Sequence, residues 1–455
     1  MVKLKRFFIE NKFIFFILIS TLILRLVFFN RFNGIWWDSA VYIGMAKSMF
    51  GTFGFWEFLR PIGLPFIFGI FWKLGLDVVF VGKIFEVICN LGIIYLVYLL
   101  GKKIFDKRVA LVASFVLAFN ALFFFLGFRL YSSIPATFFI LFAYYLILKG
   151  GFRNSVLAGF LAGFAMLIRY PVAFLLIPLS LKLGWDVIKR RAKSIRRFLG
   201  FNLTAFAMLG VYLYYNYIKF GDAFISLKAG LSSISTNHGV PVLITQYDWF
   251  YIVFLFLFFN FLLVFFVNGL YHFFKKMNEK KLFFVLLPML IFGGFLQLFV
   301  SMREERYTTP ILFAICLIIG LGFVNFKFKK VRYILLALYL VVSFTTFGFL
   351  PYTNDVLPFY AEENVPELLE FCPENVRVAS SSPLAAVHWN NVQPYYGSWT
   401  TPQIKSQVNS IDCIFYSSCD YEGVFPLDYF KRYYDVVFYD NSSWCDEYVL
   451  RNKNV

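Results

Sequence analysis

Residues 82–103 read GKIFEVICNLGIIYLVYLLGKK, a run of mostly apolar side chains that ends in a pair of lysines. A helix rises about 1.5 Å per residue, so about 20 such residues cross the roughly 30 Å hydrocarbon core of a bilayer. Similar runs recur along the chain, which predicts a polytopic helical membrane protein. We expect about eleven spans, near residues 13–29, 82–100, 109–127, 132–148, 155–168, 171–185, 198–217, 249–271, 282–300, 308–325 and 333–350.

The composition of the 455-residue chain agrees with this interpretation. Hydrophobic residues make up 60% of it and charged residues 15%, and the mean hydropathy is +0.70. A soluble globule of this size could not bury so much apolar surface. The fifth and sixth expected spans are short and break at Arg169-Tyr170-Pro171, so the number of spans stays open by one or two.

Lysine and arginine alternate between the connections, and this predicts the orientation. Cytoplasmic loops retain positive charge, so the N-terminus is expected in the cytoplasm and the chain after Pro351 outside it. These loops account for the net charge of +17, and no nucleic-acid partner is expected. The basic residues are Lys3, Lys5, Arg6 and Lys12, then Lys102, Lys103, Lys107 and Arg108, Lys149 and Arg153, the run 189–197, Lys275, Lys276, Lys280 and Lys281, and Lys327, Lys329, Lys330 and Arg332.

The tail from residue 352 to 455 has a different character from the rest. It has no span-length apolar run and carries 14 acidic against 6 basic residues. Short apolar segments at 376–379, 392–396, 413–416 and 436–439 predict buried strands, with helices near 383–390 and 426–434 between them. We therefore expect two domains, a transmembrane domain over 1–351 and a small extracytoplasmic α/β domain over 352–455.

Four of the six cysteines, Cys372, Cys413, Cys419 and Cys445, lie in this tail. An oxidising compartment would allow two disulfides, and four cysteines permit three pairings. Closeness in sequence favours Cys413 with Cys419 and Cys372 with Cys445. The other pairings stay open.

The first external loop, residues 30–80, is rich in aromatic residues and is punctuated by glycine and proline. It contains Trp36-Trp37-Asp38-Ser39-Ala40-Val41-Tyr42 and Arg60-Pro61-Ile62-Gly63-Leu64-Pro65. Apolar residues at helical spacing over 39–50 predict helices lying in the membrane interface. Asp38 stands at the start of this helix, where a carboxylate can also serve as a simple N-terminal cap.

Together these motifs resemble the first external loop of the C-superfamily (GT-C) membrane glycosyltransferases. The likeness is to the dolichyl-phosphate-mannose protein mannosyltransferases and the lipid A aminoarabinose transferases. Two further stretches extend the resemblance along the chain, the basic turn at 101–108 and Arg303-Glu304-Glu305-Arg306-Tyr307-Thr308-Thr309-Pro310. The resemblance covers roughly residues 1–325, and it rests on the order of the motifs rather than on any one of them.

The resemblance implies roles for the two loop residues. Asp38 would act as the base or orienting carboxylate for the acceptor hydroxyl, and Arg60 would bind the carrier phosphate. The residue types suit these tasks, because attack at an anomeric carbon needs a base and a departing phosphate needs cations. Arg303 or Arg306 would supply a second phosphate ligand.

Further polar side chains are expected at the rim of the site, since charges at membrane depth usually mark a site or a pathway. Arg129 and Arg169 could equally extend to lipid headgroups, and Arg303 and Arg306 could be neutralised by Glu304 and Glu305. Glu57 is spaced to pair with Arg60 on a helix. The expected rim residues are Tyr42, Glu57, Arg129, Arg169, Glu304 and Tyr307, and Arg25 is a further cation near this face.

No cofactor is expected, and the question of a divalent metal ion stays open. Some relatives place a second carboxylate beside the first, whereas this chain has Ser39, and the three histidines are scattered. Arginines alone can neutralise a lipid monophosphate, so the expected reaction is metal-independent.

The sequence thus predicts an inverting glycosyltransferase that moves one sugar from a polyprenyl (dolichyl-type) phosphate to an extracytoplasmic protein, lipid or glycan. One alternative is an oligosaccharyltransferase-like enzyme with a lipid pyrophosphate donor, although a WWD signature in those enzymes lies in the soluble domain. Another is a transporter or flippase, although no repeated halves are found. The third alternative is a membrane-anchored binding protein whose function resides in the tail.

Overall fold

A computed structural model describes residues 11–30, 35–51, 55–58, 60–189, 192–229, 250–300, 304–349, 365–380, 384–394, 410–417, 427–440 and 446–453. The chain forms two compact units. The first, a helical unit, consists of residues 1–31, 58–63 and 83–351. The second unit joins residues 32–57 and 64–82 to the tail from Tyr352 to Val455.

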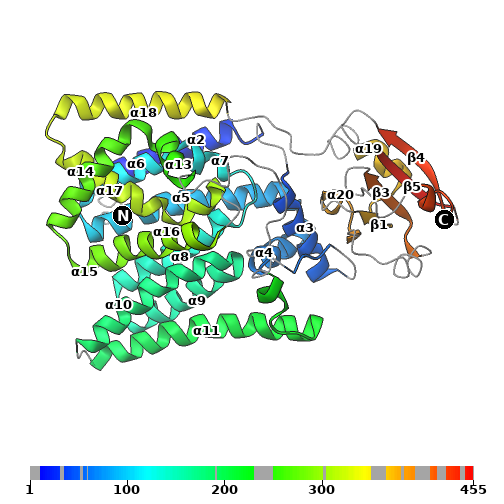
Figure 1. Ribbon diagram of the computed structural model, residues 1–455, viewed down its shortest axis with the longest axis horizontal. Helices are drawn as coiled ribbons and strands as arrows, with labels where there is room; N and C mark the ends of the chain where they lie inside the picture. Colours follow the sequence, from blue (N-terminus) through cyan, green and yellow to red (C-terminus); the bar gives the residue numbers. More distant parts are fainter. Residues whose placement is uncertain are drawn as a thin grey trace, which may run out of the picture. The chain divides into compact units, whose positions relative to one another are not determined.

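The helical unit is built from long apolar helices and short helical segments between them (Figure 1). Its elements are α2 (Lys12–Val27), α5 (Val78–Ile104), α6 (Lys107–Ala118), α7 (Ala121–Leu126), α8 (Ser133–Lys149), α9 (Phe152–Ile168), η1 (Tyr170–Leu175), α10 (Leu176–Ile188), α11 (Ala192–Phe220), α13 (Phe250–Phe259), η2 (Asn260–Leu262), α14 (Leu263–Lys275), α15 (Glu279–Lys281), η3 (Leu282–Leu286), α16 (Leu287–Phe299), η4 (Glu305–Ile311), α17 (Leu312–Asn325) and α18 (Lys329–Phe349).

Helix occupies every segment where a span was predicted, so the helical membrane fold is confirmed. Within the described residues, six helices are long and apolar enough to cross a bilayer by themselves: Val78–Ile104, Tyr170–Ile188, Ser194–Phe220, Leu257–Lys275, Glu279–Leu298 and Glu305–Asn325. The predicted break is also present, because α9 ends at Ile168 and a 3₁₀ turn with Pro171 in its first turn starts the next helix.

Glycines allow the central helices to pack at backbone distance. A Cβ on Gly322 of α17 would lie 1.8 Å from the carbonyl oxygen of Phe265 in α14, and one on Gly269 of α14 would lie 2.0 Å from that of Ile318. Gly159 of α9 meets α11 in the same way, at Phe201. Small residues at helix contacts are the usual means of association in lipid, where no hydrophobic force drives helices together.

The second unit contains a five-stranded mixed sheet of order β2-β1-β3-β5-β4. The first three strands are parallel, and β5 is antiparallel to both β3 and β4. The predicted strands are confirmed, and so are the two short helices between them. The elements are α3 (Trp37–Phe50), α4 (Gly63–Lys73), α19 (Val365–Phe371), β1 (Arg377–Ser380), α20 (Ala385–His388), β2 (Asn391–Pro394), β3 (Cys413–Ser417), α22 (Leu427–Phe430), β4 (Tyr434–Asp440) and β5 (Glu447–Asn452).

Helix α3 from the first external loop is part of the tail's hydrophobic core. Its Ala40, Val41 and Met45 lie in one buried cluster with Trp389 and Phe415. Gly44 allows this packing, because a Cβ there would lie 2.8 Å from the Cβ of Phe55 and 3.0 Å from that of Ala386 in α20. The helix that carries Asp38 is thus held by residues more than 300 positions later in the chain.

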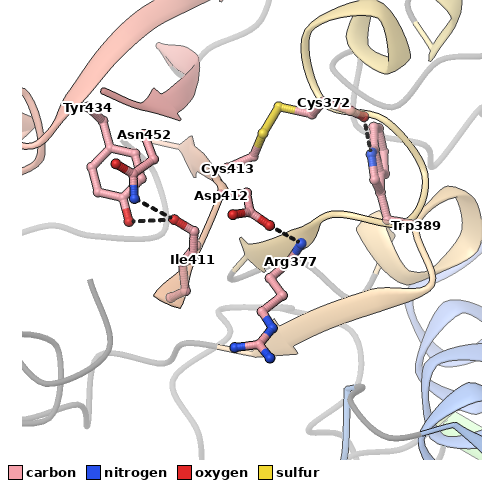
Figure 2. The surroundings of a disulfide bond; sticks show 8 residues. All are labelled: Cys372, Arg377, Trp389, Ile411, Asp412, Cys413, Tyr434 and Asn452. Atoms are coloured by element: carbon pink, nitrogen blue, oxygen red, sulfur yellow. Dashed lines mark hydrogen bonds between the residues drawn. A yellow bond between two sulfur atoms is a disulfide. The ribbon is translucent and has the colours of Figure 1, made fainter. Parts of the chain in front are cut away.

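The favoured cysteine pairing was wrong. Cys372, after α19, forms a disulfide with Cys413 at the start of β3, across a Cα–Cα distance of 6.3 Å (Figure 2). The pairing joins residues 41 positions apart, because β3 lies beside β1, which begins five residues after Cys372. The indole of Trp389 donates a hydrogen bond of 2.7 Å to the Cys372 carbonyl. Cys419 and Cys445 lie outside the described residues.

Candidate active site

Three predicted arginines meet in the helical unit, at the ends of helices. Arg129 follows α7, Arg169 follows α9, and Arg306 lies in η4. Arg129 and Arg169 are buried, and the Arg306 side chain is 14% exposed. Because η4 contacts α7 and α8, and η1 contacts α8 and α9, these cations come together at one end of the bundle. We call these three residues, together with Arg60, whose position is described below, the arginine cluster.

Aromatic rings and a hydroxyl orient the guanidinium groups. The Arg169 guanidinium donates to the Ser132 hydroxyl at 3.0 Å and lies 4.8 Å from the centre of the Tyr307 ring. Arg306 lies 4.8 Å from the Tyr131 ring and 5.7 Å from the Tyr307 ring. A guanidinium can stack on a ring through its face while its edge donates hydrogen bonds. The Tyr307 ring contacts both arginines.

Arg60 belongs to the same end of the bundle. Arg60 is half-buried. Gly63, three residues later, packs directly on the end of α9, because a Cβ on Gly63 would lie 2.7 Å from the carbonyl oxygen of Leu167. Arg169 follows that helix end directly. Phe58 also packs edge-to-face on Phe220, the last residue of α11. Phe58 and Gly63, on either side of Arg60, are therefore held against the bundle end where Arg169 lies.

Two carboxylates accompany the cations. Arg306 forms an ion pair with Glu304, so part of the predicted mutual neutralisation is present. Glu305 is half-buried and interacts electrostatically with Arg129 and Arg306. A group of arginines in a region of low dielectric suits an anionic ligand. Arg303 lies outside the described residues.

Asp38 belongs to the second unit, in the first turn of α3. The N-cap of this helix is Trp36, without a side-chain capping bond, so Asp38 is not the capping residue, although the helix N-terminus favours its negative charge. Tyr42, one turn later, is buried. Glu57 is half-buried, and the described residues around it are not helical, so the helical spacing expected for a pair with Arg60 is absent. Pro61 disfavours helix at the residue before it.

Lys47, which sequence reasoning did not single out, fixes the other end of α3. Lys47 is 5% exposed, and its ammonium donates hydrogen bonds of 3.1 Å to the carbonyls of both Val387 and Trp389. Burial lowers the pKa of Lys47 to about 8, and Glu374 opposes this shift. A lysine on an otherwise apolar helix face was the only sequence signal for this contact.

Arg25, predicted near the rim, lies in the interior. It is fully buried, donates to the Asn90 side chain at 3.1 Å and to the Phe124 carbonyl at 3.3 Å, and contacts three phenylalanine rings. These contacts account for it as a packing residue. Among the residues that the structure describes, no group of three or more His, Cys, Asp or Glu side chains is placed to hold a metal ion.

Comparison with known proteins confirms the resemblance. The family model for dolichyl-phosphate-mannose-protein mannosyltransferase matches residues 59–215, a third of the chain that includes Arg60, Arg129 and Arg169. Among solved structures, ArnT from Cupriavidus metallidurans bound to undecaprenyl phosphate superposes with a TM-score of 0.69 at 11% identity, over 97% of this chain and 98% of that one. The chain has the GT-C glycosyltransferase fold.

Two other solved structures share this fold. The oligosaccharyltransferase of Archaeoglobus fulgidus matches with a TM-score of 0.56 at 12% identity, over 96% of this chain and 75% of that one. The arabinofuranosyltransferase AftD from Mycobacteria matches with a TM-score of 0.55 at 10% identity, over 90% of this chain and 35% of that one. None of the curated proteins compared with the sequence matches it.

Proposed function

We propose that this protein is an inverting glycosyltransferase that moves a sugar from a polyprenyl-phosphate carrier to an acceptor outside the cytoplasm. The observation that carries the proposal is the arginine cluster, whose cations come from four separate segments at one end of a GT-C bundle. The ArnT structure that shares this fold contains undecaprenyl phosphate, the class of carrier that such a cluster suits.

In the proposed reaction, the acceptor oxygen attacks the anomeric carbon while the bond from that carbon to the phosphate oxygen breaks. Asp38 takes the proton of the acceptor hydroxyl, and the carrier leaves as a prenyl phosphate. The phosphate changes from a singly charged diester to a doubly charged monoester, and the one negative charge that develops on it is stabilised by Arg60, Arg169 and Arg306. No metal is needed for this neutralisation.

The proposed topology follows from the basic connections. The N-terminus faces the cytoplasm, and the arginine cluster and the tail lie on the outer side, where the acceptor is found. Cysteine accessibility labelling at Lys330 and at Asn375 in intact cells tests this arrangement. We expect Lys330→Cys to be protected from an impermeant reagent and Asn375→Cys to react.

The catalytic assignment is tested with purified protein in lipid and labelled prenyl-linked monosaccharides. Asp38→Asn should abolish transfer while the protein still binds prenyl phosphate, because the arginine cluster belongs to the other unit. Arg60→Ala should mainly weaken donor binding. Full activity of Asp38→Asn would refute the role of Asp38, and unchanged donor binding by Arg60→Ala would refute that of Arg60.

The likeness to the Archaeoglobus fulgidus oligosaccharyltransferase makes a lipid pyrophosphate the second candidate donor class. A lipid pyrophosphate donor would leave as prenyl pyrophosphate, whereas the proposed donor leaves as prenyl monophosphate. Thin-layer analysis of the released lipid distinguishes the two donors, and release of the pyrophosphate would replace the proposed reaction.

A further inference from the structure

A cavity of about 710 Å³ lies between α10 and α11, and none of the arginine cluster residues lines it. Its volume lies within the range of about 300–1,000 Å³ that is typical of ligand sites. Figure 1 shows α9, α10 and α11 running side by side, and α11 packs on both neighbours. The wall includes Leu181, Trp185 and Phe206, which are between 41% and 67% exposed, so we call this cavity the α10–α11 groove.

The interior of the groove suits a hydrocarbon chain. Its polar side chains satisfy each other, because the Ser180 hydroxyl donates to the Asn202 side chain at 2.8 Å and the Asn202 amide donates to the Phe198 carbonyl. The other lining residues are apolar or glycine. A ligand headgroup therefore finds no partner inside, and only a chain gains by entering.

The length of the groove matches one leaflet. Its lining residues in α10 run from Leu176 to Ile188, which is about 18 Å of helix at 1.5 Å per residue. Half of a hydrocarbon core of about 30 Å is about 15 Å. An acyl chain that enters from the Ile188 end would fill the groove, whereas a polyprenyl chain is considerably longer.

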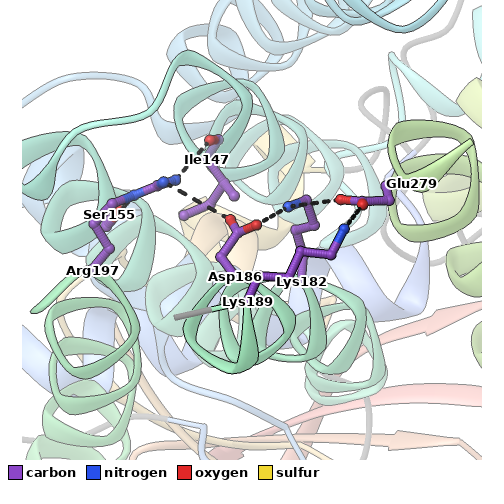
Figure 3. A network of polar contacts seen from close by, with 7 residues as sticks. All are labelled: Ile147, Ser155, Lys182, Asp186, Lys189, Arg197 and Glu279. Carbon is purple, nitrogen blue, oxygen red and sulfur yellow. Dashed lines mark hydrogen bonds and ion pairs between the residues drawn. The ribbon is translucent and has the colours of Figure 1, made fainter. Parts of the chain in front are cut away.

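The Ile188 end of the groove is strongly basic. Between residues 182 and 197 the sequence has seven lysines and arginines and one carboxylate. Figure 3 shows how part of this charge is organised: Asp186 pairs with Lys182 and Arg197, and Glu279 pairs with Lys182 and Lys189. Four of these cations, Lys182, Lys189, Arg196 and Arg197, have described side chains, and two carboxylates do not balance these four, so this end stays positive.

The polar network is joined to the groove through Trp185. Trp185 lines the groove, and the Lys189 ammonium lies 5.3 Å from its ring. Arg197 directly precedes Phe198, another lining residue, and is held by the Ser155 hydroxyl and the Ile147 carbonyl. A headgroup at this end therefore meets cations whose positions are fixed by the same elements that form the walls.

We propose that the α10–α11 groove binds an anionic phospholipid, with one acyl chain between α10 and α11 and its phosphate at the basic end. In the proposed topology this end faces the cytoplasmic leaflet, where anionic lipids are concentrated and basic pockets between helices bind their headgroups. The site is distinct from the donor site, and the proposal does not depend on which sugar is transferred.

Native mass spectrometry of the full-length protein tests the proposal, with phosphatidylglycerol and phosphatidylcholine of identical acyl chains as probes. We expect preferential retention of phosphatidylglycerol. Lys189→Gln and Arg196→Gln should each weaken the affinity for phosphatidylglycerol about fivefold, since a cation near a headgroup contributes about 1 kcal/mol. Lys330→Gln, at another basic connection, is the matched control and should leave binding unchanged.

Filling the groove provides an independent measurement. A Cβ on Gly184 would meet only the Phe198 ring, at 3.7 Å, so Gly184→Leu should fold and exclude the acyl chain while transfer from the prenyl donor persists. Equal retention of both phospholipids, or insensitivity to Gly184→Leu, would overturn the proposal. Loss of prenyl phosphate binding in Gly184→Leu would instead assign the groove to the donor and also overturn it.

Discussion

At the scale of the residue, Arg169 combines a hydrogen bond and a ring contact that a planar guanidinium can make at the same time. It donates to Ser132 and stacks on Tyr307, and lysine offers neither the fork nor the planar face. Arg169→Lys should therefore raise the KM for the prenyl-linked donor about tenfold, the effect of losing roughly 1.4 kcal/mol of binding, while the protein remains folded. Steady-state kinetics over a range of donor concentrations measures this change.

Arg332 supplies the matched control for this substitution. It also stacks on aromatic rings, those of Phe323 and Tyr333, but it lies in α18, beyond the opposite end of α17 from Arg306. Arg332→Lys should leave the donor KM unchanged. Equal effects of the two substitutions would mean that Arg169 acts through packing rather than through the donor.

Because the pKa of His388 is lowered in the folded tail, the stability of the tail should depend on pH. Burial, and next the charge of Lys47, lower the pKa of His388 to about 4, while Asp77 opposes the shift. The unfolded chain binds a proton at the ordinary pKa of about 6.5, so stability is lost as pH falls from about 6.5 to about 4. The loss should be about 2 kcal/mol, allowing for partial exposure of the ring.

Thermal unfolding of the wild type and of His388→Gln at pH 7 and pH 4.5 measures this contribution. The glutamine variant does not titrate, so it should lose less stability between the two pH values than the wild type. The same acid sensitivity in both proteins would show that other groups are responsible.

At the scale of the element, the position of α3 depends on its packing against α20. A methyl group on Gly44 would press on Phe55 and Ala386, and overpacking of this kind typically costs about 1–3 kcal/mol. Gly44→Ala should destabilise the second unit and reduce transfer more than donor binding. Thermal unfolding, turnover and prenyl phosphate binding report the three quantities.

Gly210 in α11 is the control, because a Cβ there meets nothing within 4 Å. Gly210→Ala should be neutral or slightly stabilising, since alanine is the better helix former. Full turnover by Gly44→Ala would show that the exact placement of α3 does not matter for the reaction.

The predicted elements were those with a clear local signal. The spans carry uninterrupted apolar runs, and four strands carry short apolar clusters. β5, Glu447–Asn452, was not predicted, because charged Glu447 and Arg451 interrupt its apolar residues. It forms because pairing with β3 and β4 on both sides supplies the backbone partners of a central strand.

At the scale of the whole molecule, the tail and the first external loop share one core. Deleting residues 352–455 would expose the face of α3 that Ala40, Val41 and Met45 bury. The deletion should therefore abolish transfer rather than only change the choice of acceptor. Prenyl phosphate binding should persist, because the arginine cluster belongs to the other unit.

Parallel measurement of turnover and of prenyl phosphate binding by the deleted protein tests this separation. Retained transfer with altered acceptor choice would contradict this prediction and would indicate that the tail only selects the acceptor. Loss of both activities, in a protein that still elutes as a single species, would show that the helical unit also needs the tail.

The amino-acid sequence by itself determined the membrane class of this protein, its long apolar helices and four of the five strands of the tail, because apolar runs and their periods are local properties. Only the tertiary structure decided that Arg60, Arg129, Arg169 and Arg306 gather at one end of the bundle, that Cys372 pairs with Cys413, and that α3 lies in the core of the tail. These features join residues up to several hundred positions apart, and such proximity is set by side-chain packing between elements, which no local pattern records.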